Sequence, residues 1–133
     1  MDNRSSVLVV DDDQAILDML HDALKENYDV DTASDVLEAA DLLRERNYDL
    51  LVLDLNMPVV DGEELMQIFS VHPNFETIPI LVISAYPDLI ERVKKARVNA
   101  ILPKPFSIED LHRLVAQTIE TSRPPLPPQA QQA

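Results

Sequence analysis

The sequence predicts an α/β protein in which a five-stranded parallel sheet is covered by helices on both faces. Three short runs are continuously apolar, which is typical of strands buried on both sides. They are VLVV at Val7–Val10, LLVL at Leu50–Leu53 and ILVI at Ile80–Ile83. Segments with helical periodicity separate these runs, and alternating strands and helices imply right-handed crossover units in a parallel sheet.

Two weaker strands and five helices complete the pattern. The weaker strands are expected at Asp29–Ala33 and Ala100–Leu102. Five strands arranged in this way favour the flavodoxin-like, doubly wound order 2-1-3-4-5. Apolar residues recur every three to four positions in the helical segments, which are expected at Gln14–Asn27, Asp35–Arg46, Gly62–Val71, Asp88–Lys95 and Ser107–Thr121.

Local signals mark some helix starts and the end of the domain. Asp35 and Glu38 stand at the N-cap and N3 positions of the second helix, a variant of the capping box. Ser107 is suited to cap the last helix. The length of 133 residues corresponds to one domain, expected over residues 1–121. The segment 122–133, SRPPLPPQAQQA, is rich in Pro and Gln and is expected to be a flexible tail or linker.

Composition excludes several classes of function. There is no Cys, so disulfides and thiolate chemistry are excluded, and the single Gly rules out a Walker A or GxGxxG loop. The net charge of -13 argues against direct nucleic-acid binding. No apolar run approaches the roughly 18–20 residues of a membrane-spanning helix. The first residues also lack the features of a signal peptide, so a cytoplasmic protein is expected.

Polar residues with chemical potential follow four of the predicted strands. Asp11 and Asp12 follow the first strand, Asp54 the third, Ser84 the fourth and Lys104 the fifth. Functional groups gather at the carboxyl ends of parallel strands, and the order 2-1-3-4-5 places these ends side by side. Carboxylates this close repel one another, and a hard divalent cation such as Mg²⁺ relieves the repulsion. A carboxylate nucleophile, a metal, a Lys and a hydroxyl together form a site for an aspartyl phosphate.

The motifs at these strand ends identify a family resemblance. The segments VLVVDDD, LLVLDLNMPVVDG, LVISA and LPKPF occur in the order found in receiver domains of two-component response regulators. The second contains the pattern D-x-x-M-P-x-x-D-G, which is quite specific. The chain therefore resembles these receivers over about residues 5–121, including the single-domain chemotaxis type.

The resemblance implies a role for each acidic residue. Asp54 would be the phosphoacceptor. Asp11 and Asp12 would be the acidic pair, with Asp12 the direct metal ligand. The backbone carbonyl of Asn56 would complete the protein's share of the Mg²⁺ shell, in which Mn²⁺ could take the place of Mg²⁺.

It also implies roles for the residues around the phosphoryl group. Ser84 would be the switch hydroxyl and Ala85 the small residue beside the phosphate. Lys104 would pair with the phosphate, and the Lys104–Pro105 bond is expected to be cis. The family usually has Tyr or Phe at the position of Ile101, and often Gly-Ala where Arg97 and Val98 stand. We therefore expect Ser84 to move on phosphorylation while residue 101 changes little.

The implied function is a signalling switch that catalyses only its own phosphorylation and dephosphorylation. The phosphoryl group would come from a sensor histidine kinase or a histidine phosphotransfer protein. The output would be an unidentified protein or a fused domain. The resemblance also implies a weak dimer through the face formed by the fourth helix, fifth strand and fifth helix.

Three other functions are open from the residues alone. A Mg²⁺-dependent phosphatase that forms an aspartyl phosphate needs a second Asp two residues after the nucleophile, and here that residue is Asn56. A flavodoxin-like binding module needs a phosphate loop rich in Ser, Thr and Gly, and here three Asp stand in its place. A receiver-like interaction module that is never phosphorylated is compatible with Ile101 and Arg97, although the acidic residues and the Lys are all present.

Overall fold

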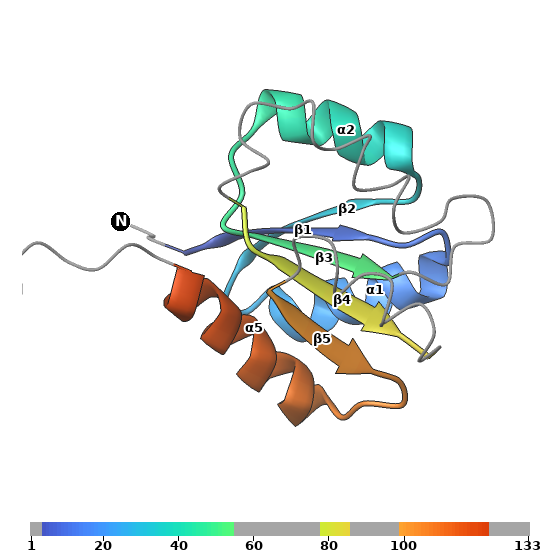
Figure 1. Cartoon of the computed structure of the whole chain (residues 1–133). Helices are drawn as coiled ribbons and strands as arrows, with labels where there is room; N and C mark the ends of the chain where they lie inside the picture. The colour runs from blue at the N-terminus through green and yellow to red at the C-terminus, as the bar shows by residue number, and fades with distance from the viewer. Residues whose placement is uncertain (1–3, 55–77, 86–98, 123–133) are drawn as a thin grey trace, which may run out of the picture.

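The computed structural model of the chain has the predicted architecture (Figure 1). It describes residues 4–54, 78–85 and 99–122. Five parallel strands form one sheet in the order β2-β1-β3-β4-β5, which confirms the predicted topology. The strands are β1 (Ser6–Val10), β2 (Asp29–Ala33), β3 (Leu50–Asp54), β4 (Ile80–Ser84) and β5 (Ala100–Pro103).

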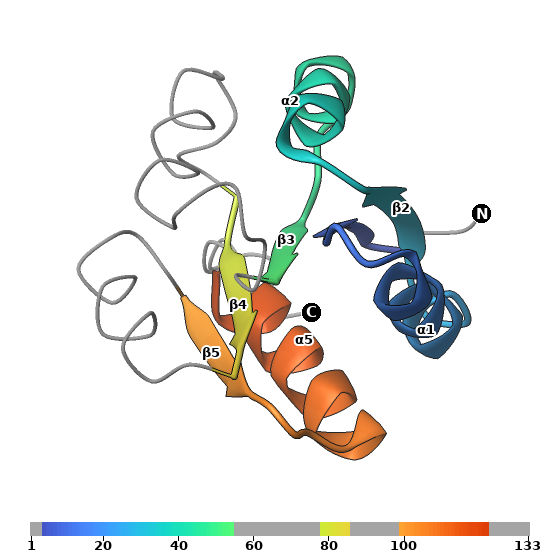
Figure 2. The same cartoon turned by 90° about the vertical axis from the view of Figure 1, so that its right-hand side faces the viewer.

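Three helices lie in the described part of the chain. They are α1 (Gln14–Leu24), α2 (Val36–Glu45) and α5 (Ile108–Ser122). Figures 1 and 2 show α2 on one face of the sheet and α1 with α5 on the other. No helix in this part of the chain is long and apolar enough to cross a membrane. The helices predicted at Gly62–Val71 and Asp88–Lys95, and the segment 123–133, lie outside the described residues.

Alternate residues of each central strand enter two separate cores. On β1, Leu8 and Val10 pack toward α2, whereas Val7 and Val9 pack toward α1 and α5. All four are fully buried. Because successive side chains of a strand point to opposite faces, a strand covered on both sides must be apolar at every position. This explains the continuous apolar runs of β1, β3 and β4.

The two edge strands are less buried than the central three. β2 begins exposed and only Ala33 at its end is buried, and in β5 only Leu102 is buried. An edge strand has one neighbour instead of two and receives less cover from the helices. That position accounts for the weaker apolar pattern of both segments.

The capping predictions are confirmed at α2 and α5. The Glu38 amide donates to Asp35 Oδ1 at 2.8 Å, and the Glu38 carboxylate reaches back to the Ser34 amide at 3.2 Å. At α5 the Asp110 amide donates to Ser107 Oγ at 3.0 Å. These contacts satisfy amides that have no partner within the first turn of a helix.

Helix α1 ends at Leu24, three residues before the predicted end at Asn27. The amide of Tyr28 donates back to the Leu24 carbonyl at 3.0 Å, which turns the chain toward β2. The Arg4 guanidinium donates to the Lys25 carbonyl at 3.0 Å. A residue from before β1 thus satisfies the carbonyl of Lys25, the C-cap residue, and local periodicity did not reveal that contact.

Candidate functional site

The register of the sheet brings three of the predicted site residues to one edge. Val10 of β1 pairs with Leu53 of β3, so Asp11 follows β1 beside Asp54 at the end of β3. Asp54 in turn pairs with Ile83 of β4, and Ser84 is the next residue. Asp11, Asp54 and Ser84 are all buried, at 2%, 1% and 0% exposure. Buried polar groups at the carboxyl edge of a parallel sheet are typical of a functional site.

Lys104 reaches this edge from the neighbouring strand. Ser84 pairs with Pro103 of β5, and the Lys104 amide donates to the Ser84 carbonyl at 3.0 Å. The Lys104 ammonium lies 2.5 Å from Asp54 Oδ2. This Asp–Lys pair places a cation against the predicted phosphoacceptor. The Lys104–Pro105 bond is cis, as predicted.

Only one oxygen of the Asp11 carboxylate accepts a hydrogen bond from the described residues. Its Oδ1 accepts a hydrogen bond from the Asp13 amide at 2.9 Å. Its Oδ2 is buried and receives no donor from the described residues. Burial raises the pKa of Asp11 to about 7, and the adjoining Asp54 carboxylate adds to this shift. A buried oxygen surrounded by carboxylates is a position that a cation would stabilise.

The donors at this edge fit Mg²⁺. Among the described residues no three carboxylate or imidazole side chains gather into a metal cage. Mg²⁺ does not need one, because it usually keeps several waters and takes only one or two carboxylates plus phosphate oxygens. Asp11 and Asp54 supply buried carboxylates, and Asp12 lies exposed beside them. The predicted fourth ligand, Asn56, lies outside the described residues.

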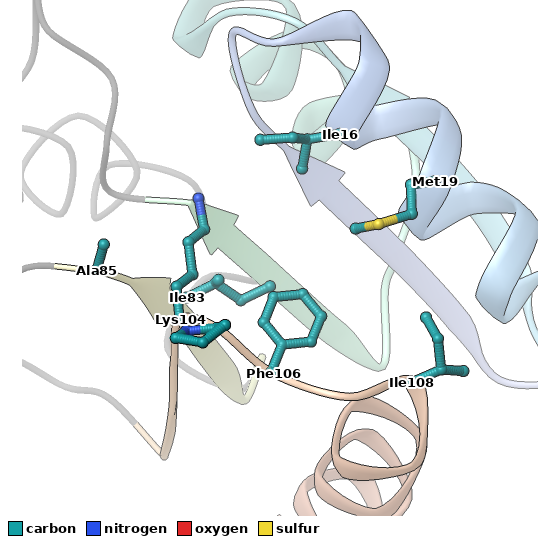
Figure 3. Close-up of a pocket in the computed structure, with 8 residues that line it drawn as sticks. Ile16, Met19, Ile83, Ala85, Lys104, Phe106 and Ile108 are labelled. Atoms are coloured by element: carbon teal, nitrogen blue, oxygen red, sulfur yellow. The ribbon is translucent and has the colours of Figure 1, made fainter.

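An apolar cavity of about 590 Å³ opens beside Lys104. Figure 3 shows Ile16 and Met19 of α1 on one side and Phe106 with Ile108 on the other. Ala85, predicted to lie next to the phosphate, also lines it and is exposed. Met19 and Ile108 are 42% and 43% exposed, which is high for large apolar residues.

This cavity was not predicted from the sequence. Phe106 belongs to the LPKPF motif, and Ile16 lies in the segment predicted to be helical at Gln14–Asn27. Residues from α1 and from the start of α5 meet only in the folded sheet, so no local pattern joins them. Ile101 is half-buried on β5, opposite Val82 of β4. That Ile101 changes little on phosphorylation stays a prediction.

A 2-1-3-4-5 sheet with a buried Asp paired to a partly exposed Lys, and a second buried carboxylate at its carboxyl edge, defines the receiver class of α/β domain. The family comparison agrees. The chain belongs to the response regulator receiver domain family, whose model matches residues 7–116.

Curated relatives include several mycobacterial response regulators. The response regulator MprA of Mycobacterium avium is 36% identical over 121 residues, which is 89% of this chain and 52% of that protein. MprA of Mycobacterium sp. strain KMS is 40% identical over 108 residues, covering 79% of this chain and 46% of that protein. The chain thus spans about half the length of the curated relatives it matches.

Solved receiver structures share the fold. Chemotaxis protein CheY4 of Vibrio cholerae has a TM-score of 0.79 at 29% identity, covering 86% of this chain and 98% of that one. The receiver domain of Francisella response regulator 1452 has a TM-score of 0.77 at 31% identity, covering 90% and 100%. The receiver of sensor histidine kinase PA1611 from Pseudomonas aeruginosa, with magnesium in its active site cleft, has a TM-score of 0.78 at 24% identity, covering 88% and 98%.

Proposed function

We propose that this chain is a phosphorylation-dependent switch whose phosphoacceptor is Asp54. The observation that carries the proposal is the buried Asp54 carboxylate, 2.5 Å from the Lys104 ammonium and beside Asp11 at the end of the central strand. Membership of the receiver family supports the same role. We further propose that this switch works in the cytoplasm, where kinase phosphodonor domains reside.

The chemistry proposed for the site is an in-line transfer to a carboxylate oxygen. An Asp54 oxygen attacks phosphorus, the bond from phosphorus to the donor's histidine nitrogen breaks, and the imidazole leaves. Lys104 then holds a phosphoryl oxygen in place of Asp54 Oδ2. Mg²⁺ bound by Asp11, Asp12, Asp54 and the Asn56 carbonyl would balance the remaining negative charge; Mn²⁺ could substitute.

We propose that the readout begins at Ser84, at the end of β4, and at Lys104, which follows β5. The Lys104 amide already donates to the Ser84 carbonyl, so movement of either residue is coupled to the other. Ser84 would turn its hydroxyl to the phosphoryl group, and Ala85 leaves room beside it. The output is a separate protein or a fused domain, and a weak dimer through the fourth helix, β5 and α5 is part of the same proposal. The greater length of the MprA relatives supports a fused domain.

The proposed phosphorylation can be tested without a kinase. Wild type is incubated with acetyl phosphate and Mg²⁺, and its intact mass is measured. We expect a gain of one phosphoryl group in wild type and none in Asp54→Asn, which keeps the shape and removes the nucleophile. Continuous release of phosphate from an added phosphomonoester would instead support the phosphatase alternative.

We also propose that the phosphohistidine donor docks over the apolar cavity. The cavity adjoins Lys104, and its walls carry Met19 and Ile108, which are large, apolar and exposed. A protein that delivers a phosphoryl group to Asp54 must cover this edge of the sheet. Burial of such exposed side chains by a partner is favourable.

This docking surface can be separated from the chemistry by comparing two donors. Met19→Glu should slow transfer from a histidine kinase active on wild type by about 10-fold or more. Transfer from acetyl phosphate should be unchanged. Leu37→Glu is the matched control, because Leu37 is also apolar and 76% exposed but lies on α2 across the sheet. Equal slowing by both variants, or by neither, would contradict the assignment.

A further inference from the structure

We propose that Asp13 is a positioning residue for the metal site, because it fixes the orientation of the Asp11 carboxylate. It would do so through its backbone amide, which its own side chain holds in place by capping α1. The inference rests on the proposed function, since it concerns Mg²⁺ binding at the same edge of the sheet.

Three polar groups of Asp13 form hydrogen bonds at the start of α1. Its side-chain Oδ1 accepts the Ala15 amide at 2.9 Å, and its carbonyl accepts the Leu17 amide at 3.0 Å. Its own amide donates to Asp11 Oδ1 at 2.9 Å. The residue is extended, with φ -93° and ψ 111°, as an N-cap residue should be. The cap and the contact to Asp11 are therefore parts of one rigid turn.

Asp11 depends on this turn for the direction of its side chain. Its backbone is anchored separately, because the Asp11 amide donates to the Ala33 carbonyl of β2 at 3.1 Å. Among the described residues, the Asp13 amide is the group that donates a hydrogen bond to the Asp11 carboxylate. It occupies Oδ1, and no other described residue donates to the buried Oδ2. That second oxygen is the one left for a cation.

Loss of the Asp13 cap should therefore weaken metal binding as well as the helix. An unsatisfied first turn frays, and the amide that orients Asp11 moves with it. The carboxylate must then be ordered when the cation binds, which lowers affinity. Partners that orient a metal ligand commonly change affinity by about 10- to 100-fold when removed.

The second helix provides a matched control. Asp35 caps α2 as Asp13 caps α1, with an extended backbone and a carboxylate that accepts the Glu38 amide at 2.8 Å. No hydrogen bond links Asp35 to Asp11 in the described part of the chain. Asp35→Ala therefore removes the same charge and the same kind of cap without touching the metal ligand.

The test is a Mg²⁺ titration of the ¹⁵N-labelled full chain, at constant ionic strength, followed by amide chemical shifts. Wild type, Asp13→Ala, Asp13→Asn and Asp35→Ala are compared. We expect Asp13→Ala to bind Mg²⁺ about 10-fold more weakly than wild type. Asp13→Asn should bind nearly as well as wild type, because Asn caps a helix as effectively as Asp. Asp35→Ala should also remain close to wild type.

Two outcomes would overturn the inference while leaving the proposed metal site intact. Wild-type affinity in Asp13→Ala would show that the cap does not position Asp11. Equal weakening in Asp13→Asn would show that the charge of Asp13 acts, rather than its cap. Absence of any saturable response in wild type would overturn the metal site itself, and this inference with it.

A measurement on wild type keeps the inference testable if Asp13→Ala does not fold. In metal-free protein the Asp13 amide should exchange with solvent slowly for so exposed a residue, because it is bound to Asp11. Its chemical shift should move in step with Mg²⁺ binding. Fast exchange, or a shift unaffected by Mg²⁺, would contradict the proposed contact.

Discussion

Two adjacent carboxylates at the sheet edge are stabilised in different ways. Asp54 has a Lys104 ammonium at 2.5 Å, whereas Asp11 has one backbone amide and a second oxygen without a donor from the described residues. Burial raises the pKa of Asp11 to about 7 as a result. In metal-free protein the protonated form of Asp11 is therefore favoured below about pH 7, and a bound cation would favour the ionised form.

This difference predicts a pH dependence of stability in the absence of metal. The pKa of Asp11 rises from 3.8 to about 7 on folding, so the folded chain binds more protons between these values. Stability from Asp11 is present below pH 4 and is lost as the pH rises toward 7. The Asn side chain of Asp11→Asn cannot ionise. The unfolding free energy of this variant, relative to that of wild type, should therefore rise by about 1–3 kcal/mol between pH 5 and pH 8.

Urea unfolding of both proteins in chelator at the two pH values measures this gain. From pH 5 to pH 8 the unfolding free energy of wild type should fall relative to that of Asp11→Asn. An unchanged difference would mean that Asp11 ionises in the folded chain as readily as in the unfolded one. Addition of Mg²⁺ at pH 8 should raise the unfolding free energy of wild type relative to that of the variant, because a ligand that binds the folded state stabilises it.

At the scale of elements, helix α2 shows how burial decides the effect of a substitution. Leu43 is 1% exposed in the core between α2 and the sheet, whereas Leu37 on the same helix is 76% exposed. Leu43→Ala should cost about 2–5 kcal/mol of unfolding free energy through lost burial and a cavity. Leu37→Ala should stay within about 0.5 kcal/mol. Denaturant unfolding of the two variants checks this, and similar losses would contradict the packing of α2.

Elements could be predicted where the signal is local. The central strands could be predicted from their continuous apolar runs, which reflect cover on both faces. The starts of α2 and α5 could be predicted from the capping residues Asp35 and Ser107. The end of α1 was predicted three residues too late, and the contact of Arg4 with the Lys25 carbonyl joins residues too distant in sequence to be seen in a local pattern. The cavity beside Lys104 was missed for the same reason: Met19 and Phe106 come together only across the folded sheet.

At the scale of the whole molecule, topology carried most of the site prediction. Once the strand order is 2-1-3-4-5, Asp11, Asp54, Ser84 and Lys104 must gather at one edge, and the register places them there. Alternation of strands and helices predicted a parallel sheet, and the order was predicted as the one favoured for five such strands. The direct Lys104 contact to Asp54 could not be predicted, nor could the Asp11 oxygen that receives no donor from the described residues, because side-chain rotamers decide both.

The location of the phosphoryl group tests the central proposal most directly. Wild type is phosphorylated with acetyl phosphate and Mg²⁺, and borohydride then reduces any aspartyl phosphate to homoserine. Peptide mass mapping should find homoserine at residue 54, dependent on Mg²⁺ and absent from Asp54→Asn. A phosphoryl group mapped to another residue, or wild-type labelling of Asp54→Asn, would contradict the assignment of Asp54 as the phosphoacceptor.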